Sequence, residues 1–138
     1  NAELYVGGAD DPRRMGDRYD DFLRNTFDRA LDQSSSDSFK VVMSHRPSGF
    51  DTAIERGVQL TLSGHTHGCQ IGFMGEPIFN EWGGERYVWG QYKKGKSQVY
   101  TSSGVGHWFP FRLGCPTEAP IIVLKRGIDP NPEKGRVV

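Results

Sequence analysis

Short apolar runs separated by polar and glycine-rich segments alternate along the first half of the chain. The run Leu4-Tyr5-Val6 ends at two glycines, residues 39–43 form a second run, and residues 58–62 form a third. Each run is too short for a helix, so we expect three buried strands. Apolar residues recur every three or four positions over residues 18–31, which predicts an amphipathic helix. With a short helix at about residues 50–56, the pattern is that of a β-α-β layer, and the predicted fold class is α/β.

The second half of the chain is richer in aromatic residues and glycines. Residues 87–92 and 99–101 are typical of two strands joined by a tight turn, and residues 120–125 predict a last strand. Residues 127–138 are polar and contain two prolines, which is typical of a disordered tail. We therefore expect residues 1–126 to belong to one domain and residues 127–138 to trail from it.

Composition excludes several classes of protein. Among the 138 residues, 17 Lys and Arg balance 17 Asp and Glu, so net charge offers no reason to expect a nucleic-acid partner. The chain has neither an apolar run long enough to span a bilayer nor the features of a signal peptide. Its two cysteines fit a reducing compartment, although one disulfide in an exported protein stays open. We expect a soluble chain, in the cytoplasm of a bacterium or at the periphery of its membrane.

The four histidines carry the clearest chemical signal. They occupy positions 45, 65, 67 and 107, each in a loop that follows a predicted strand. Neighbouring strands deliver such residues to one edge of a layered α/β protein, where ligands bind. His65 and His67 would project from the same side of an extended segment, and neutral imidazole is the commonest protein ligand of metals such as Zn and Fe. We therefore predict that His45, His65 and His67 bind metal, whereas a surface role is the simpler interpretation of His107.

Two segments around these histidines resemble a known family. The sequence Ser63-Gly64-His65-Thr66-His67-Gly68, preceded by Ser44-His45-Arg46-Pro47, resembles the last two motifs of the calcineurin-like metallophosphoesterases. Residues 99–106 and 111–116 are similar to the C-terminal part of bacterial members, so the likeness covers most of residues 4–126. It implies an α/β/β/α sandwich and two divalent ions, Mn, Fe or Zn. His45 and His65 would bind one ion and His67 the other.

Such a pair of ions activates a bridging water and clamps the phosphoryl oxygens. The resemblance therefore implies a metallophosphoesterase that hydrolyses phosphate mono- or diester or pyrophosphate bonds. Its substrate would be a phosphorylated small molecule or a lipid-linked compound. The sequence does not choose between them.

The chain departs from the family in its first half. Family members also carry Asp-x-His, Gly-Asp-x-x-Asp and Gly-Asn-His, and the first and third are absent. Gly16-Asp17-Arg18-Tyr19-Asp20 matches the second by letter, but it opens the predicted amphipathic helix, where acids have an ordinary electrostatic role. We therefore expect the C-terminal half of a four-layer sandwich, completed by an N-terminal half of the same domain. By itself it should bind at most one metal weakly and hydrolyse nothing.

Other residues are candidates for secondary roles. His107 and Arg112 could contact substrate, since a guanidinium matches phosphate oxygens, although Arg112 could equally pair with a structural carboxylate. Cys69 could be a thiol beside the metal or a small buried residue. The aromatic residues could form an apolar wall for a lipid-like or sugar-nucleotide substrate, or simply pack: Trp82, Trp89, Trp108, Phe109 and Phe111.

Two other functions stay open. One is a non-catalytic metal-binding or interaction module that uses the same three histidines, and metal stoichiometry would distinguish it from a dinuclear enzyme. The other is a redox protein that uses Cys69 and Cys115, which lie 46 residues apart without a Cys-x-x-Cys motif.

Overall fold

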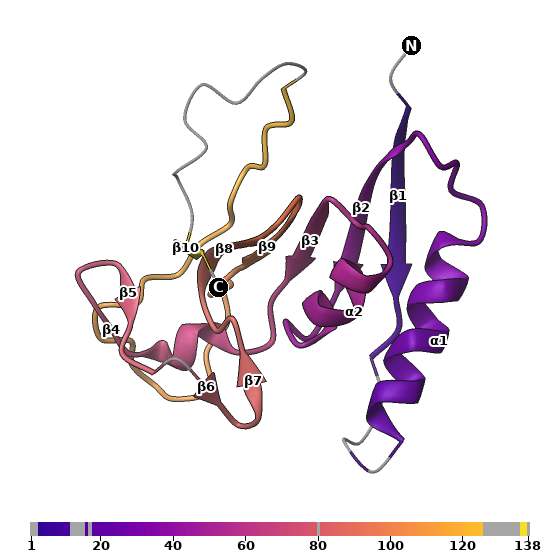
Figure 1. Ribbon diagram of the computed structural model, residues 1–138. Helices are drawn as coiled ribbons and strands as arrows, with labels where there is room; N and C mark the ends of the chain where they lie inside the picture. Colours follow the sequence, from indigo (N-terminus) through magenta and orange to yellow (C-terminus); the bar gives the residue numbers. More distant parts are fainter. Residues whose placement is uncertain (1–2, 12–15, 17, 80, 126–135, 138) are drawn as a thin grey trace.

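The computed structural model describes residues 3–11, 16, 18–79, 81–125 and 136–137. Six strands form one mixed sheet in the order β1-β2-β3-β9-β8-β10 (Figure 1). The first four strands in this order are mutually parallel, β8 is antiparallel to β9, and β10 is parallel to β8. The strands are β1 (Leu4–Ala9), β2 (Phe39–Ser44), β3 (Leu60–Ser63), β9 (Ser97–Thr101), β8 (Gly90–Lys94) and β10 (Arg136–Val137).

Two helices, α1 (Tyr19–Leu31) and α2 (Gly49–Glu55), cover one face of this sheet. Phe27 of α1 and Phe50 of α2 are fully buried against Val42 of β2 and Val99 of β9. These two valines lie on the same face, because the register pairs Val42 with Thr61 and Thr61 with Val99. The hydrophobic core therefore lies between the helices and the middle of the sheet.

The opposite face of β1 and β2 is apolar, and the described residues leave much of it uncovered although Val41 on this face is buried. Leu4, Val6 and Met43 are each more than half exposed, and Phe39 lies beside Leu4 in the register. A second sheet of the expected four-layer sandwich would pack on such a face. The mixed α/β class is confirmed, whereas the four-layer arrangement stays a prediction.

The elements expected in the first half are confirmed with changed bounds, and the strand expected over residues 58–62 spans Leu60–Ser63. The first strand continues through its two glycines to Ala9 instead of ending at Val6. Gly7 lies so close to α1 that an added Cβ would stand 2.5 Å from the carbonyl oxygen of Ala30. The glycine therefore allows the helix to approach the strand, and does not interrupt it.

The second half differs more from expectation. The hairpin of β8 and β9 is confirmed, but its first strand begins at Gly90 because Tyr87, at a φ of 59°, is not extended. The strand expected over residues 120–125 is wrong: these residues form no ladder with any described strand, and Ile121 is 89% exposed. Strand-forming residues alone do not make a strand without a neighbouring edge.

Three further features were not expected from the sequence. Two small hairpins, β4 (Gly72–Phe73) with β5 (Glu76–Pro77) and β6 (Glu81–Trp82) with β7 (Glu85–Arg86), gather at one end of the molecule, away from α1 (Figure 1). A 3-10 turn, η1, spans His67–Gln70. The predicted tail lies outside the described residues except for β10. No helix within the described ranges has the length and apolarity needed to cross a bilayer.

Candidate metal centre

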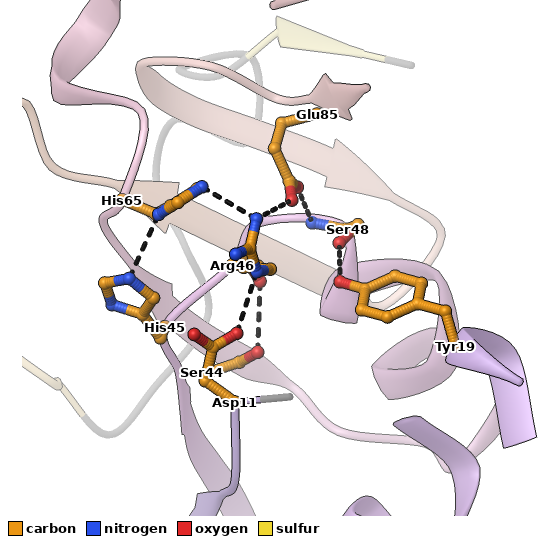
Figure 2. A network of polar contacts seen from close by, with 8 residues as sticks. All are labelled: Asp11, Tyr19, Ser44, His45, Arg46, Ser48, His65 and Glu85. Atoms are coloured by element: carbon orange, nitrogen blue, oxygen red, sulfur yellow. Dashed lines mark hydrogen bonds and ion pairs between the residues drawn. The ribbon is translucent and has the colours of Figure 1, made fainter. Parts of the chain in front are cut away.

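The carboxyl ends of the parallel strands place two of the predicted histidines together. β2 ends at Ser44 and β3 ends at Ser63, so His45 and His65 follow neighbouring strands at the same edge. The His65 Nδ1 atom lies 3.0 Å from the His45 Nε2 atom, and the ring centroids are 4.8 Å apart (Figure 2). The expectation that strand ends bring these two residues together is confirmed.

Arg46 contacts the other nitrogen of His65. Its Nη1 atom lies 2.8 Å from His65 Nε2. A guanidinium only donates hydrogen bonds, so Nε2 is the acceptor and the imidazole proton resides on Nδ1, facing His45. Burial of the ring lowers the pKa of His65, and the positive charge of Arg46 lowers it further, so both favour the neutral ring.

Two carboxylates compensate the charge of Arg46, and sequence reasoning missed both. Arg46 Nε lies 2.8 Å from Asp11 Oδ1, and Arg46 Nη1 lies 3.3 Å from Glu85 Oε1. Glu85 is almost completely buried and also accepts a hydrogen bond from the Ser48 N–H at 3.0 Å. Asp11 is the second residue after the end of β1, which is a signal that strand-end reasoning could have used. Glu85 comes from the small hairpin of β6 and β7, and no local pattern marked it.

In the part of the chain that the structure describes, His67 forms no three-residue metal group with His45 and His65, and the reason for expecting His65 and His67 on one side does not hold. The segment is not extended: His65 has a φ of 69° and His67 a φ of 51°, at the start of η1. The two rings are therefore not related by the alternation of an extended strand. His67 packs at 4.8 Å against the Trp108 ring, and the His65 ring lies 6.4 Å from the same ring. His67 Nδ1 donates to the Gly106 carbonyl at 3.2 Å, an arrangement that in the neutral form of the ring places the lone pair on Nε2. Among the described residues, no group of three or more His, Cys, Asp or Glu side chains is arranged to hold an ion.

Comparisons with known proteins show the family to which this chain belongs. The chain is 34% identical over 87 residues to the phosphodiesterase YaeI of Escherichia coli, which is 62% of this chain and 32% of that protein. It is 34% identical over 115 residues to an uncharacterized metallophosphoesterase of Helicobacter pylori, 77% of this chain and 30% of that protein. A third relative is the uncharacterized metallophosphoesterase YkuE of Bacillus subtilis, 32% identical over 102 residues, with 72% and 35% covered.

The chain belongs to the calcineurin-like metallophosphoesterase superfamily. It spans about a third of the length of the curated relatives that it matches. No family model matches it, and no solved structure matches it.

The donors present fit part of the metal centre that a metallophosphoesterase requires. A separation of 3.0 Å allows His45 Nε2 and His65 Nδ1 to reach one ion at the usual distance of about 2.1 Å. The hydrogen bond from His67 Nδ1 to a carbonyl is typical of an imidazole that offers Nε2 to a metal. Neutral imidazoles supply no negative charge, and the nearby carboxylates of Asp11 and Glu85 pair with Arg46.

A loop rich in aromatic residues lies beside His67, and Gln70 organises it. The fully buried Gln70 amide donates to the carbonyls of Phe109 and Phe111, and accepts from the N–H groups of Trp108 and Phe109. The aromatic side chains of this loop are nevertheless exposed by about half. Of the predicted apolar wall, Trp89 is buried in the interior and the side chain of Trp82 lies outside the described residues.

Arg112 and His107, the predicted substrate residues, differ in surroundings. The terminal nitrogens of Arg112 donate to backbone carbonyls of both flanking loops, those of His67, Ser103, Gly104, Gly106, Cys115 and Pro116. These hydrogen bonds connect the loop of His67 to the aromatic loop. Arg112 therefore has structural partners, and they are carbonyls and not the carboxylate that the alternative interpretation expected. His107 is exposed. Substrate contact by either residue stays a prediction.

Cys69 is buried, with 1% of its surface exposed. This burial raises the pKa of its thiol to about 11, and burial also raises the pKa of Cys115. Both residues are free cysteines. A protonated, buried thiol favours the interpretation of Cys69 as a small packing residue, because metal binding and oxidation both require the thiolate.

Proposed function

We propose that this chain contributes part of the dinuclear metal centre of an enzyme that hydrolyses phosphate mono- or diester or pyrophosphate bonds. The observation that carries the proposal is the juxtaposition of His45 Nε2 and His65 Nδ1, 3.0 Å apart at the carboxyl edge of the sheet. Their motifs belong to a chain whose curated relatives are named metallophosphoesterases or phosphodiesterase.

In this proposal each histidine has a distinct role. His45 and His65 bind one divalent ion, and His67 binds the second through Nε2, with its ring oriented by the Gly106 carbonyl. Bound Mn, Fe or Zn would supply Lewis-acid activation of water and of phosphoryl oxygens. The three imidazoles are neutral ligands, so they do not offset the repulsion between two divalent cations. We therefore infer that bridging carboxylates come from outside this chain.

The proposed source of those carboxylates is the N-terminal half of the same domain. The uncovered apolar face of β1 and β2, with Leu4, Val6 and Met43 more than half exposed, supports such a partner. The length of the curated relatives, about three times that of the matched region, supports it as well. A second sheet on this face would complete the four-layer sandwich.

The proposed substrate is a phosphorylated small molecule or a lipid-linked phosphoester. The Trp108 ring packs 4.8 Å from the His67 ring, and Trp108, Phe109 and Phe111 are each about half exposed, which supports an apolar group beside the phosphoester. His107 and Arg112 are the proposed contacts on the substrate side. Comparison of Trp108→Ala on lipid-linked and small soluble esters tests this choice: equal losses on both would contradict the lipid-linked option.

A chimera tests the proposed function. The matched segment of the Escherichia coli phosphodiesterase YaeI is replaced by residues 1–125 of this chain, and hydrolysis of bis(p-nitrophenyl) phosphate is measured with Mn²⁺. We expect activity in the chimera, and its loss by at least about a hundredfold in His65→Gln and in His67→Gln. Lys96→Gln, on the exposed turn between β8 and β9, is the matched control.

The isolated chain gives the complementary measurement. Calorimetric titration with Mn²⁺ should show at most one weakly bound ion, and the chain should not hydrolyse the diester. Robust hydrolysis by the chain alone would refute the need for a second half. An inactive but folded chimera that binds one ion would favour the alternative, a non-catalytic metal-binding or interaction module.

A further inference from the structure

Arg46, the residue after His45, lies between the other histidine of the pair and two carboxylates. Figure 2 shows its guanidinium between the His65 ring on one side and the carboxylates of Asp11 and Glu85 on the other. Its side chain is 17% exposed and that of Glu85 is 2% exposed. The ion pair is therefore largely removed from water, and both charges depend on their partners in the protein.

The direction of the hydrogen bonds follows from the chemistry of the donors. Arg46 Nη1 can only donate, so His65 Nε2 holds the single lone pair of a neutral ring and His65 Nδ1 holds the proton. That proton lies between His65 Nδ1 and His45 Nε2, 3.0 Å away. Both nitrogens that face each other are thereby used in one hydrogen bond. The remaining lone pair of His65 points at Arg46.

A metal ion and Arg46 make incompatible demands on this ring. An ion on Nδ1 places the ring proton on Nε2, where it faces the N–H of Arg46, so two donors meet. An ion on Nε2 needs the lone pair that Arg46 already uses. Histidines that bind metal usually donate their other N–H to a carboxylate or a carbonyl. Glu85 is a carboxylate on the side of His65 Nε2, but Arg46 lies between Glu85 and the His65 ring and contacts both.

We propose that Arg46 is a positioning residue that selects the Nδ1–H form of His65 and thereby competes with a metal ion for this imidazole. The inference rests on the proposed function in that His65 binds metal. Before a metal ion can bind His45 and His65 together, Arg46 must release His65 Nε2 while it keeps its contacts with the carboxylates. Asp11 Oδ1 keeps a separate contact with Nε of Arg46, so the guanidinium retains a partner when this happens.

Nitrogen-edited NMR of the histidine rings in the metal-free chain tests the selection directly. We expect His65 with its proton on Nδ1 in the wild type and in Arg46→Lys, which keeps a donor. Arg46→Met should lower the Nδ1–H population. Since this change leaves Glu85 buried without its partner, Arg46→Met combined with Glu85→Gln is the second variant, which removes both charges. An Nε2–H ring in the wild type, or an unchanged ring in the folded variants, would overturn the proposal.

Calorimetric titration with Zn²⁺ tests the competition. Arg46→Met should bind Zn²⁺ about tenfold more tightly than the wild type, which is opposite in sign to the loss that follows removal of a supporting group from a metal-binding histidine. Arg56→Met is the matched control, because Arg56 pairs with Asp28 and Glu55 at the surface and should leave the affinity unchanged. Equal or weaker binding by folded Arg46→Met contradicts the competition.

The two measurements separate this inference from the proposed function. If neither the wild type nor any variant binds Zn²⁺, then both the competition and the proposed metal-binding role of His65 are contradicted. The selection of the Nδ1–H form would in that case still be decided by the metal-free spectra. If Zn²⁺ binds and Arg46→Met changes nothing, the proposed function survives and this inference does not.

Discussion

Gly68, between His67 and Cys69, is the residue at which a single methyl group should do most damage to the loop of the candidate site. Its φ is +60°, in the left-handed region that L-residues avoid. An added Cβ would lie 2.6 Å from the Cys115 Sγ atom and 3.2 Å from the Trp89 ring. Gly68→Ala therefore combines backbone strain with a steric clash in a buried region.

The chain contains glycines that separate these two effects. Gly57 has nearly the same φ, +65°, but an added Cβ would meet nothing within 4 Å, so Gly57→Ala introduces strain alone. Gly64 has neither a left-handed φ nor a close neighbour. The left-handed conformation costs roughly 1–2 kcal/mol for a residue with a Cβ, and overpacking a core adds roughly 1–3 kcal/mol.

From these values we expect Gly68→Ala to lower the free energy of unfolding by about 2–5 kcal/mol. Gly57→Ala should cost about 1–2 kcal/mol, and Gly64→Ala less than about 0.5 kcal/mol. Urea unfolding followed by tryptophan fluorescence measures the differences, and Trp89 reports directly on the Gly68 contact. With a slope of about 2 kcal/mol per molar urea, a loss of 3 kcal/mol moves the midpoint by about 1.5 M.

The comparison between the two strained sites decides the reasoning. If Gly68→Ala costs no more than Gly57→Ala, then the Cys115 and Trp89 side chains yield freely and the region is not packed as described. A cost of Gly64→Ala as large as that of Gly68→Ala would show that the effect follows from proximity to the histidines and not from strain and clash.

Three further predictions concern the interior around the site. Gln70→Met removes the amide that forms hydrogen bonds with the backbone of residues 108–111, and it should lower the free energy of unfolding by about 1–3 kcal/mol. The control Gln91→Met loses one side-chain hydrogen bond, to Gln98, and should cost less. Equal losses would contradict the buried role of Gln70. Cys69, with a pKa of about 11, should resist iodoacetamide at pH 8 in the native chain and react in denaturant, and mass spectrometry showing native labelling would contradict its burial. Burial raises the pKa of Tyr87 to about 12, so the folded chain keeps this proton longer than the unfolded chain: the stabilisation is complete below pH 10 and is lost as the pH rises towards 12. Circular dichroism should show unfolding over that range with a gentler pH dependence in Tyr87→Phe, and tyrosinate absorbance complete near pH 10 in folded protein would refute it.

Local pattern was sufficient for the elements that have a strong period or a clear boundary. The spacing of Leu23 and Phe27 predicted α1, because residues four apart lie on one face of a helix and both are buried. Pattern was insufficient where an element depends on a distant edge. Residues 120–125 have the composition of a strand, yet no described strand lies beside them to supply hydrogen bonds.

The candidate site, too, could be predicted from the sequence only in part. His45 and His65 could be predicted as neighbours because they follow strands that are adjacent and parallel. The conformation of the loop that carries His67 could not, because it depends on the left-handed φ of His65 and His67 and on the turn that follows. Glu85 could not be predicted either, since nothing near it in the sequence distinguishes a buried carboxylate from a solvated one.

The sequence by itself therefore determined the α/β class, the family motifs, and the two histidines at the sheet edge, because period and strand order are local properties. Only the tertiary structure decided which imidazole nitrogens face each other and which partners hold Arg46. Those facts depend on the register between strands and on contacts of Arg46 with Asp11 and Glu85, which lie 35 and 39 residues away along the chain. The direction of each hydrogen bond then follows from a guanidinium that can only donate.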